Sequence, residues 1–151
     1  MKKFALTIHP EKTRQINFKP DNKGKDRTFD FLGFTHYWGK GRGGGWTIKR
    51  QRKKKNIANL LKKIKQLCKE NRHETIKDQY GKLKIVLRGH YQYFAVRCNG
   101  KQLYPVYHMS KILWKKWLNR RGGKRSYGRE EFEMLLKNFS LPVPKIIHQN
   151  V

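Results

Sequence analysis

The segment TFDFLGFTHYWGKGRGGGW, Thr28 to Trp46, alternates bulky and small residues and then breaks into glycines. Alternation with a period of two is typical of a β-strand, and it predicts a strand from Thr28 to Tyr37. Apolar residues fall on both sides of this strand, with Phe29, Phe31 and Gly33 on one side and Asp30, Leu32 and Phe34 on the other. We therefore expect both faces of the strand to be covered by other parts of the molecule.

The glycine-rich run that follows, residues 39–45, predicts a flexible tip, and Trp46 to Lys49 predicts the strand that returns from it. Together these segments form a β-hairpin. The run lacks the lysine and the Ser or Thr of a phosphate-binding P-loop, and no helix follows it directly. Two interpretations of the tip stay open: a mobile basic loop that contacts backbone phosphates, and a plain solvent-exposed turn.

The hydrophobic period changes near residue 50 from two to three and four, which is typical of amphipathic helices. Helices are predicted over Arg52–Arg72, about Thr75–Phe94, about Lys101–Arg120 and about Arg129–Asn138. Thr75 can cap the second helix, because Asp78 lies three residues further on. The short links between the first three helices predict a compact bundle.

The sequence thus predicts an α+β fold, in which an N-terminal β-hairpin is followed by a three-helix bundle and a short C-terminal helix. Two further apolar runs, Phe4–Ile8 and Gln15–Phe18, extend the β-rich part. The change in composition divides the chain into a β segment (1–50), a helical domain (51–121) and a C-terminal part (122–151). In the last part a basic linker leads to the short helix, and two prolines predict an extended end.

The chain carries 37 Lys and Arg against 10 Asp and Glu, a formal charge of +27, and 13% of its residues are aromatic. Charge and aromatic content together favour nucleic acid as the partner. No apolar run approaches the about 18 residues of a membrane-spanning helix. His9-Pro10 interrupts the N-terminal apolar run, which is therefore not interpreted as a signal peptide. Because two distant cysteines, Cys68 and Cys98, fit a reducing compartment, we expect a cytoplasmic protein that binds no membrane.

No pattern in the sequence predicts catalysis by this chain alone. Nucleotidyl transfer uses paired carboxylates to hold metal ions, and the ten acids form no convincing pair. Asp30 stands between Phe29 and Phe31, where a structural role is favoured. Neither cysteine has partners at the spacing of a zinc site, and Cys68 lies on an apolar helix face as a core thiol. We predict no metal and no cofactor in this chain.

Candidate RNA-binding residues lie in two basic groups and one aromatic segment. The first group is Lys53, Lys54, Lys55, Lys62, Lys63 and Lys69, and the second is Lys115, Lys116, Arg120, Arg121, Lys124 and Arg125. In the segment LRGHYQYF, aromatic residues alternate with basic and hydrogen-bonding ones, a mixture that suits unpaired RNA. Its members Leu87, Tyr91 and Phe94 fall on the inner face of a helix, which leaves Arg88, His90 and Tyr93 for RNA. Trp114 and Trp117 are interpreted as core residues.

In their order along the chain, LTIHPEKT, FDFLGFTHYWGKGRGGGW, the basic three-helix bundle and LRGHYQYF resemble the C-terminal part of a bacterial group II intron reverse transcriptase/maturase. Proteins of this family resemble a right hand: fingers and palm copy RNA into DNA, and the thumb with the maturase region grips intron RNA for splicing. The resemblance covers nearly the whole chain. It implies that residues 1–50 are the end of the palm and that residues 51–121 are the thumb, or maturase-specific, domain.

The resemblance also implies roles for single residues. Phe31, Leu32, Gly33 and Phe34 resemble the strand near the primer grip, so the hairpin is expected to lie against a palm. Lys12 matches a lysine proposed to assist the leaving pyrophosphate, a role that it can have only with a palm from a partner chain.

The paired aspartates of the family's palm should precede Leu6, and no Asp-Asp pair occurs in the sequence. The expected function is therefore binding of structured group II intron RNA to assist RNA splicing, as part of a mobile element. RNA-directed DNA synthesis is expected only if a fingers and palm chain completes the polymerase and its Mg²⁺ site in trans. The alternative is a ribosomal-type structural RNA-binding protein.

Overall fold

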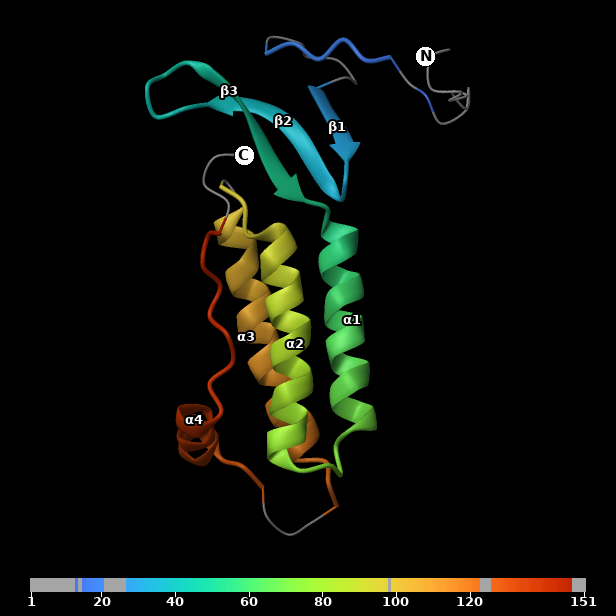
Figure 1. The fold of residues 1–151 in the computed structure, drawn as a ribbon, viewed down its shortest axis with the longest axis vertical. Helices are drawn as coiled ribbons and strands as arrows, with labels where there is room; N and C mark the ends of the chain where they lie inside the picture. The colour runs from blue at the N-terminus through green and yellow to red at the C-terminus, as the bar shows by residue number, and fades with distance from the viewer. Residues whose placement is uncertain (1–12, 14, 21–26, 98, 123–125, 148–151) are drawn as a thin grey trace, which may run out of the picture.

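The structure is a computed structural model that describes residues 13, 15–20, 27–97, 99–122 and 126–147. Three strands precede four helices, and the sheet lies at one end of the helical bundle (Figure 1). The elements are β1 (Thr28–Phe31), β2 (Phe34–Lys40), β3 (Trp46–Arg52), α1 (Lys54–Glu70), α2 (Ile76–Phe94), α3 (Gly100–Leu118) and α4 (Arg129–Asn138). This order confirms the predicted α+β fold. No helix within the described residues is long and apolar enough to cross a membrane.

A tight turn at Leu32 and Gly33 separates β1 from β2. Both residues have a positive φ, 46° at Leu32 and 80° at Gly33, as the central residues of a type I′ hairpin do. β1 and β2 pair antiparallel, with Phe31 opposite Phe34. The single strand predicted from Thr28 to Tyr37 is therefore wrong, because the turn interrupts it.

The turn also changes which side chains lie on the same face of the sheet. Residues opposite each other in an antiparallel pair share a face, so Phe31 lies on the same face as Phe34. One face, which we call the aromatic face, carries Phe29, Phe31, Phe34, His36, Trp38 and Trp46. The opposite face is mostly polar and carries Thr28, Asp30, Thr35, Tyr37, Lys49 and Gln51. The sequence-based expectation of a strand with apolar residues on both faces is thus incorrect.

Two parts of the chain cover the aromatic face. The ring of Phe18 stacks on Trp38, with 5.4 Å between centroids, and meets the edge of Phe29 at 4.8 Å. Residues 15–18 form no strand, although one apolar run was expected there. At the other end of the face, Phe34 is buried, and its ring centroid lies 5.2 Å from that of Phe94 in α2. The sheet is therefore attached to the bundle through Phe34.

β2 and β3 form the predicted hairpin around a tip at residues 41–45. The Gly41 N–H donates to the Gly45 carbonyl oxygen at 2.8 Å and closes the tip. β3 continues to Arg52, so the first helix begins at Lys54 rather than at Arg52 as predicted. The cause is tertiary: the Arg52 N–H donates to the Asn99 side-chain oxygen at 3.1 Å and holds this residue in the strand.

The four helices agree with the sequence, and each observed end lies within two residues of the predicted one. Thr75 is the N-cap of α2, and its hydroxyl oxygen accepts the Asp78 N–H at 3.2 Å. Gly81 and Gly89 of α2 do not serve close packing, because a Cβ at either position would meet no neighbouring atom within 4 Å.

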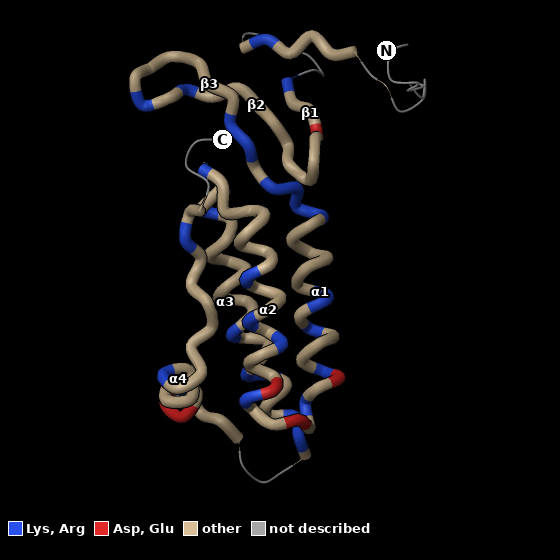
Figure 2. The backbone as a smooth tube through the Cα atoms, viewed as in Figure 1, with Lys and Arg blue, Asp and Glu red and all other residues tan. Residues whose placement is uncertain are grey.

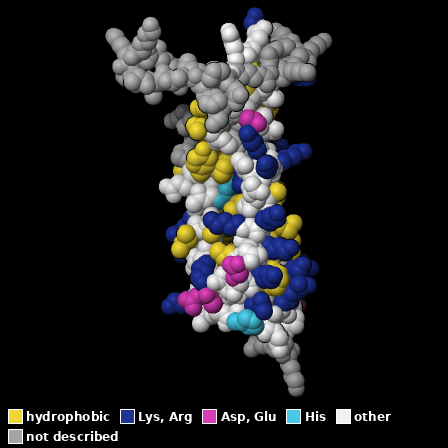
Figure 3. All heavy atoms as spheres, turned by 90° about the vertical axis from the view of Figure 1, so that its right-hand side faces the viewer, with side chains coloured by type: hydrophobic (Ala, Val, Ile, Leu, Met, Phe, Trp, Pro, Cys, Tyr) yellow, Lys and Arg dark blue, Asp and Glu magenta, His cyan; other side chains and the backbone are white. Residues whose placement is uncertain are grey.

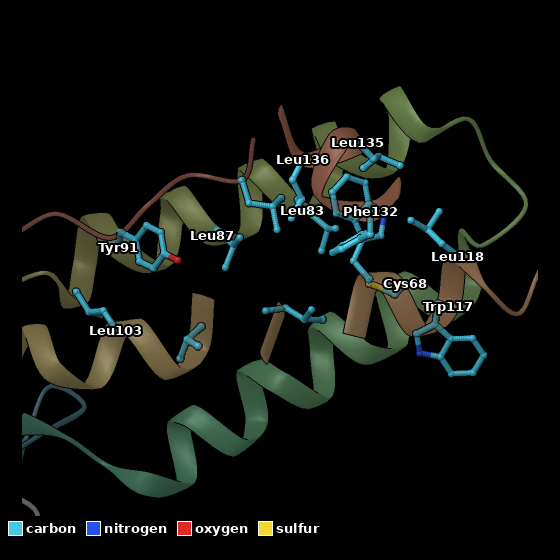
Figure 4. Packing of buried hydrophobic residues seen from close by; sticks show 14 of the residues in the cluster. Cys68, Leu83, Leu87, Tyr91, Leu103, Trp117, Leu118, Phe132, Leu135 and Leu136 are labelled. Atoms are coloured by element: carbon cyan, nitrogen blue, oxygen red, sulfur yellow. The ribbon is translucent and has the colours of Figure 1, made fainter. Parts of the chain in front are cut away.

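The hydrophobic core lies between α1, α2 and α3 and extends to α4 (Figure 4). Trp114 and Trp117 belong to it, with 0% and 8% of their surface exposed, and Cys68 is 1% exposed. The three predictions of core positions are confirmed. Burial raises the pKa of Cys68 to about 12, so this thiol is inert near neutral pH. The Trp114 Nε1–H donates to the buried Gln79 Oε1 at 3.0 Å.

After α4 the chain returns along the bundle toward the sheet end as an extended tail, residues 139–147 (Figure 1). Leu141 anchors this tail in the core, with 2% of its surface exposed. The Ile147 N–H donates to the Ala95 carbonyl oxygen at 2.9 Å, just beyond the end of α2. The extended end predicted from Pro142 and Pro144 is therefore observed, and it is packed against the bundle.

Candidate nucleic-acid interface

The outward side of α1 carries six exposed lysines, which we call the α1 lysine face: Lys54, Lys55, Lys62, Lys63, Lys65 and Lys69. The opposite side is apolar, and Ile64 and Cys68 bury it in the core. With 3.6 residues per turn, all of these lysines except Lys63 fall within an arc of about 100°. The amphipathic pattern that folds α1 onto the bundle therefore also gathers its charge on one surface.

The α1 lysine face has almost no counter-charge. The only acid in α1 is Glu70, whose carboxylate accepts a hydrogen bond from Gln66 Nε2 at 2.6 Å. None of the six lysines forms an ion pair with another described residue. Figure 3 shows Lys and Arg side chains gathered along this side, and Figure 2 shows how few acids lie near them. At 1.5 Å per residue the face is about 25 Å long.

Two differences separate this face from the predicted first group. Lys53 lies just before α1, and its Nζ is 2.9 Å from Asp30 Oδ2. A hydrogen bond from Thr35, together with Lys53, lowers the pKa of Asp30, as expected for a structural acid. Lys65 is missing from the predicted group, although its position on the helical wheel, close to Lys54 and Lys69, could have identified it.

The described members of the second predicted group do not form one surface. Lys116 and Arg120 are exposed. α3, which carries Lys116, ends at the end of the bundle away from the sheet, as α1 does (Figure 1). Lys115 instead points toward α4, with its Nζ 5.9 Å from the centre of the Phe132 ring. Arg121 is half-buried and donates to the Glu74 carbonyl oxygen at 2.8 Å. Lys124 and Arg125 lie outside the described residues, as does Lys12.

The three residues predicted to face RNA on α2 have different surroundings. Arg88 is exposed. Tyr93 is 50% exposed, and its hydroxyl donates to the Leu32 carbonyl oxygen at 2.9 Å, so it ties α2 to the hairpin turn. His90 is only 7% exposed and contacts Arg52. The expectation that His90 contacts RNA is not supported, because the side chain lies in the junction between sheet and bundle.

Arg52 is a buried cation in this junction, with 5% of its surface exposed. Its Nη2 donates to the Asn56 carbonyl oxygen at 2.6 Å, and its guanidinium carbon lies 4.2 Å from the centre of the Phe94 ring. Its Nη1 lies 3.0 Å from His90 Nε2. Because a guanidinium only donates, His90 Nε2 is the acceptor and the ring proton is on Nδ1. Sequence reasoning missed this role for Arg52, since the residue stands at a boundary between strand and helix patterns.

Burial and the neighbouring Arg52 lower the pKa of His90 to about 4. Burial also lowers the pKa of Arg52, to about 10, which leaves the guanidinium charged at neutral pH. No carboxylate among the described residues pairs with it. The junction is thus held by a neutral histidine, an aromatic ring and backbone oxygens around one positive charge.

The residues that resemble a primer grip form the turn beside this junction. Phe34 is buried, whereas Phe31 and Leu32 are 60% and 66% exposed. A hollow of about 380 Å³ opens between the turn and α2, and Phe31, Leu32, Arg50 and Tyr93 are among its lining residues. The turn therefore presents apolar side chains to the exterior, and Arg50 of β3 lines the hollow beside them.

Within the described residues, no group of three or more His, Cys, Asp or Glu side chains is arranged to hold a metal ion. The described surface offers cations along α1 and exposed aromatic and apolar groups at the sheet. The chain matches no protein-family model, no curated protein and no solved structure.

Proposed function

We propose that this chain binds structured RNA in the cytoplasm, as the C-terminal, thumb-containing part of a group II intron reverse transcriptase/maturase that assists splicing. The observation that carries the proposal is the α1 lysine face: six exposed lysines without an ion-pair partner among the described residues, on a chain with a formal charge of +27. Surface cations without counter-charge bind phosphates favourably, because binding releases condensed counterions from the RNA.

The α1 lysine face recognises the shape of folded RNA rather than its base sequence. Its lysines are point charges on flexible stems, which bind phosphates but carry no pattern of donors and acceptors for base edges. A straight row of about 25 Å suits the backbone of folded RNA, which proteins recognise largely through phosphates and ribose. The aromatic face and the turn at Leu32 would contact other partners.

The same proposal assigns the exposed turn to a fingers and palm chain. Phe31 and Leu32 are the apolar groups that such a chain would cover. RNA-directed DNA synthesis would then depend on aspartates and Mg²⁺ held by that chain, because the ten acids here include no adjacent pair of aspartates.

The test is a charge reversal on α1, Lys62→Glu with Lys65→Glu, measured by RNA-binding titration at several salt concentrations. If six to ten phosphates are contacted, wild-type affinity falls about 10³- to 10⁵-fold between 50 and 200 mM salt. The variant should bind more weakly and with a shallower salt dependence. Its helical circular dichroism should persist, since both positions are exposed.

The matched control reverses two exposed lysines elsewhere, Lys101→Glu with Lys137→Glu, and changes the net charge equally. Equal losses in both variants would show that only net charge matters and would contradict the α1 interface. Wild-type protein that binds no folded RNA at physiological salt would overturn the proposal. Co-sedimentation of the chain with ribosomes in lysates would favour the ribosomal alternative instead.

A further inference from the structure

A second hollow, of about 220 Å³, lies where α3 and α4 meet, away from the α1 lysine face. Each helix contributes residues spaced three and four apart, so the hollow is built by one stripe from each helix. The lining includes Lys111, Ile112 and Lys115 of α3 and Arg129, Phe132 and Glu133 of α4.

The rim of this hollow is cationic. Lys111, Lys115 and Arg129 face a single carboxylate, Glu133, which leaves a formal surplus of two positive charges. The Lys111 Nζ lies 3.7 Å from Glu133 Oε1, and that carboxylate is 58% exposed, so the ion pair is weak. Arg129 has no hydrogen-bond or ion-pair partner among the described residues.

The floor of the hollow is apolar. Phe132 is 4% exposed and packs edge-on against Trp114, with 6.0 Å between centroids, which fixes it in the core. Ile112 is 59% exposed, although it stands on a helix whose other large apolar residues are mostly covered. An apolar floor below a cationic rim suits a ligand that joins a flat apolar part to an anion.

The size of the hollow limits what such a ligand can be. Sites for whole small molecules commonly measure about 300–1,000 Å³, and this hollow, at about 220 Å³, is smaller. It suits one unit of a longer chain. A nucleotide of single-stranded RNA has both required parts, a phosphate for the rim and a base for the floor, and arginine planes commonly stack on unpaired bases.

We propose that the hollow between α3 and α4 binds one unpaired nucleotide of RNA, with the base on Ile112 and the phosphate between Lys115 and Arg129. This site rests on the proposed RNA binding and adds to it a contact for single strands, distinct from the α1 lysine face that binds folded RNA. The chain would thus hold a folded region and a neighbouring unpaired nucleotide at the same time.

The first test uses the wild-type chain and a single-stranded oligoribonucleotide carrying one 4-thiouridine, cross-linked by light and mapped by mass spectrometry. Cross-links should fall on the peptides that contain Ile112 and Arg129. Cross-links confined to α1 or to the sheet would overturn the site.

The second test measures the affinity of the variant Ile112→Ser with Arg129→Gln for that oligonucleotide. Both side chains are exposed, so the fold should persist. Affinity should fall about 10-fold, because the apolar contact between the base and Ile112 and one phosphate contact are lost together. The slope of log K against log salt should become shallower by about 0.7, as expected for one phosphate of a single strand.

The control variant Ile85→Ser with Lys137→Gln removes one exposed isoleucine and one positive charge outside the hollow, and it should bind the oligonucleotide as wild type does. Equal weakening in both variants would overturn the site. If the site variant loses the single strand but keeps folded RNA, both proposals are supported. If folded RNA binds normally and the site variant is unchanged, the hollow fails while the proposed function stands.

Discussion

Arg52 and His90 form one of the contacts between the sheet and the bundle. The arginine is buried without a carboxylate partner among the described residues. The neutral imidazole accepts a hydrogen bond from it, with 3.0 Å between Arg52 Nη1 and His90 Nε2. A second positive charge on His90 would face the guanidinium directly, with no acid among the described residues to offset it. Protonation of His90 is therefore expected to destabilise the junction.

Stability should fall as the pH decreases through the titration of His90. The pKa is about 4 in the folded chain and near the ordinary value of 6.5 in the unfolded chain, so the unfolded state takes up the proton first. The stability that the neutral His90 side chain contributes to the folded chain is complete above pH 6.5 and is lost progressively between pH 6.5 and pH 4. The full difference corresponds to about 3 kcal/mol in the free energy of unfolding. Urea denaturation at a series of pH values measures it.

The variant His90→Gln isolates this effect, because the Gln side-chain oxygen can accept from Arg52 but does not titrate. Its stability should be flatter between pH 6.5 and pH 4 than that of wild type. Burial also lowers the pKa of His36. Its effect on the pH dependence of stability is the same in wild type and in His90→Gln, so it cancels when the two are compared. Identical pH slopes would assign the acid sensitivity to groups other than His90.

At the scale of elements, the β1–β2 turn places a leucine where the backbone favours Gly or Asn. Leu32 has a φ of 46°, and left-handed backbone costs about 1 kcal/mol or more for an ordinary side chain. The side chain is 66% exposed, so its packing offsets little of this conformational strain. This strained, exposed leucine is one of the two apolar residues that the proposed function assigns to contact with a partner chain.

Leu32→Asn should therefore stabilise the free chain by about 1 kcal/mol, since Asn-Gly is a favoured type I′ pair. The melting temperature should rise by about 3 °C for a domain of this size. Leu32→Ala serves as the control, because it removes the same apolar surface without a preference for positive φ. Equal melting temperatures for the two variants would show that the turn is not strained.

The returning tail should contribute to stability mainly through Leu141. Its side chain is 2% exposed, and truncation of a buried leucine costs about 2–5 kcal/mol. Leu141→Ala should therefore lower the free energy of unfolding by about 3 kcal/mol in denaturant titrations. Val143→Ala on the same tail removes a side chain that is 51% exposed and should change it by less than about 0.5 kcal/mol. Similar effects at both positions would mean that the tail does not complete the core.

The sequence predicted the elements whose signals are local. Thr75 and Asp78 mark the start of α2, and apolar spacing places Trp114 and Trp117 in the core. The turn at Leu32 was missed, because bulky apolar residues continue through it from Phe29 to Phe34 and a leucine gives no turn signal. The burial of Arg52 and His90 was missed because it arises only when the sheet meets α2. One of the three residues predicted to face RNA, His90, therefore lies in the junction instead.

The candidate nucleic-acid interface was likewise predicted where its signal lies within one helix. The α1 lysines follow from the amphipathic period of one helix, which is why most of them are found in a single face. The second basic group was treated as one surface from its closeness in sequence. Successive residues point about 100° apart on a helix, and Lys115 and Lys116 accordingly face different surroundings.

For the whole molecule, a formal charge of +27 on 151 residues creates strong self-repulsion. Added salt should therefore raise the melting temperature of the free chain by screening.

Folded RNA at about 100 times its Kd should stabilise the chain by about 2.7 kcal/mol, or about 8 °C. Thermal unfolding followed by circular dichroism measures both effects. Lys62→Glu with Lys65→Glu should reduce the shift caused by RNA while a rise with salt persists. A melting temperature that decreases with salt would contradict the importance of self-repulsion.

The packing of residues 139–147 across the bundle also bears on the rates of folding. Contacts within the helical hairpins are short in sequence, whereas Leu141 and Ile147 meet partners many residues earlier, such as Ala95. Contacts that close long loops tend to form late. The tail should then be largely absent from the folding transition state, so its loss would speed unfolding and leave the folding rate nearly unchanged. Residues 139–147 would thus govern how long the native state survives once it has formed.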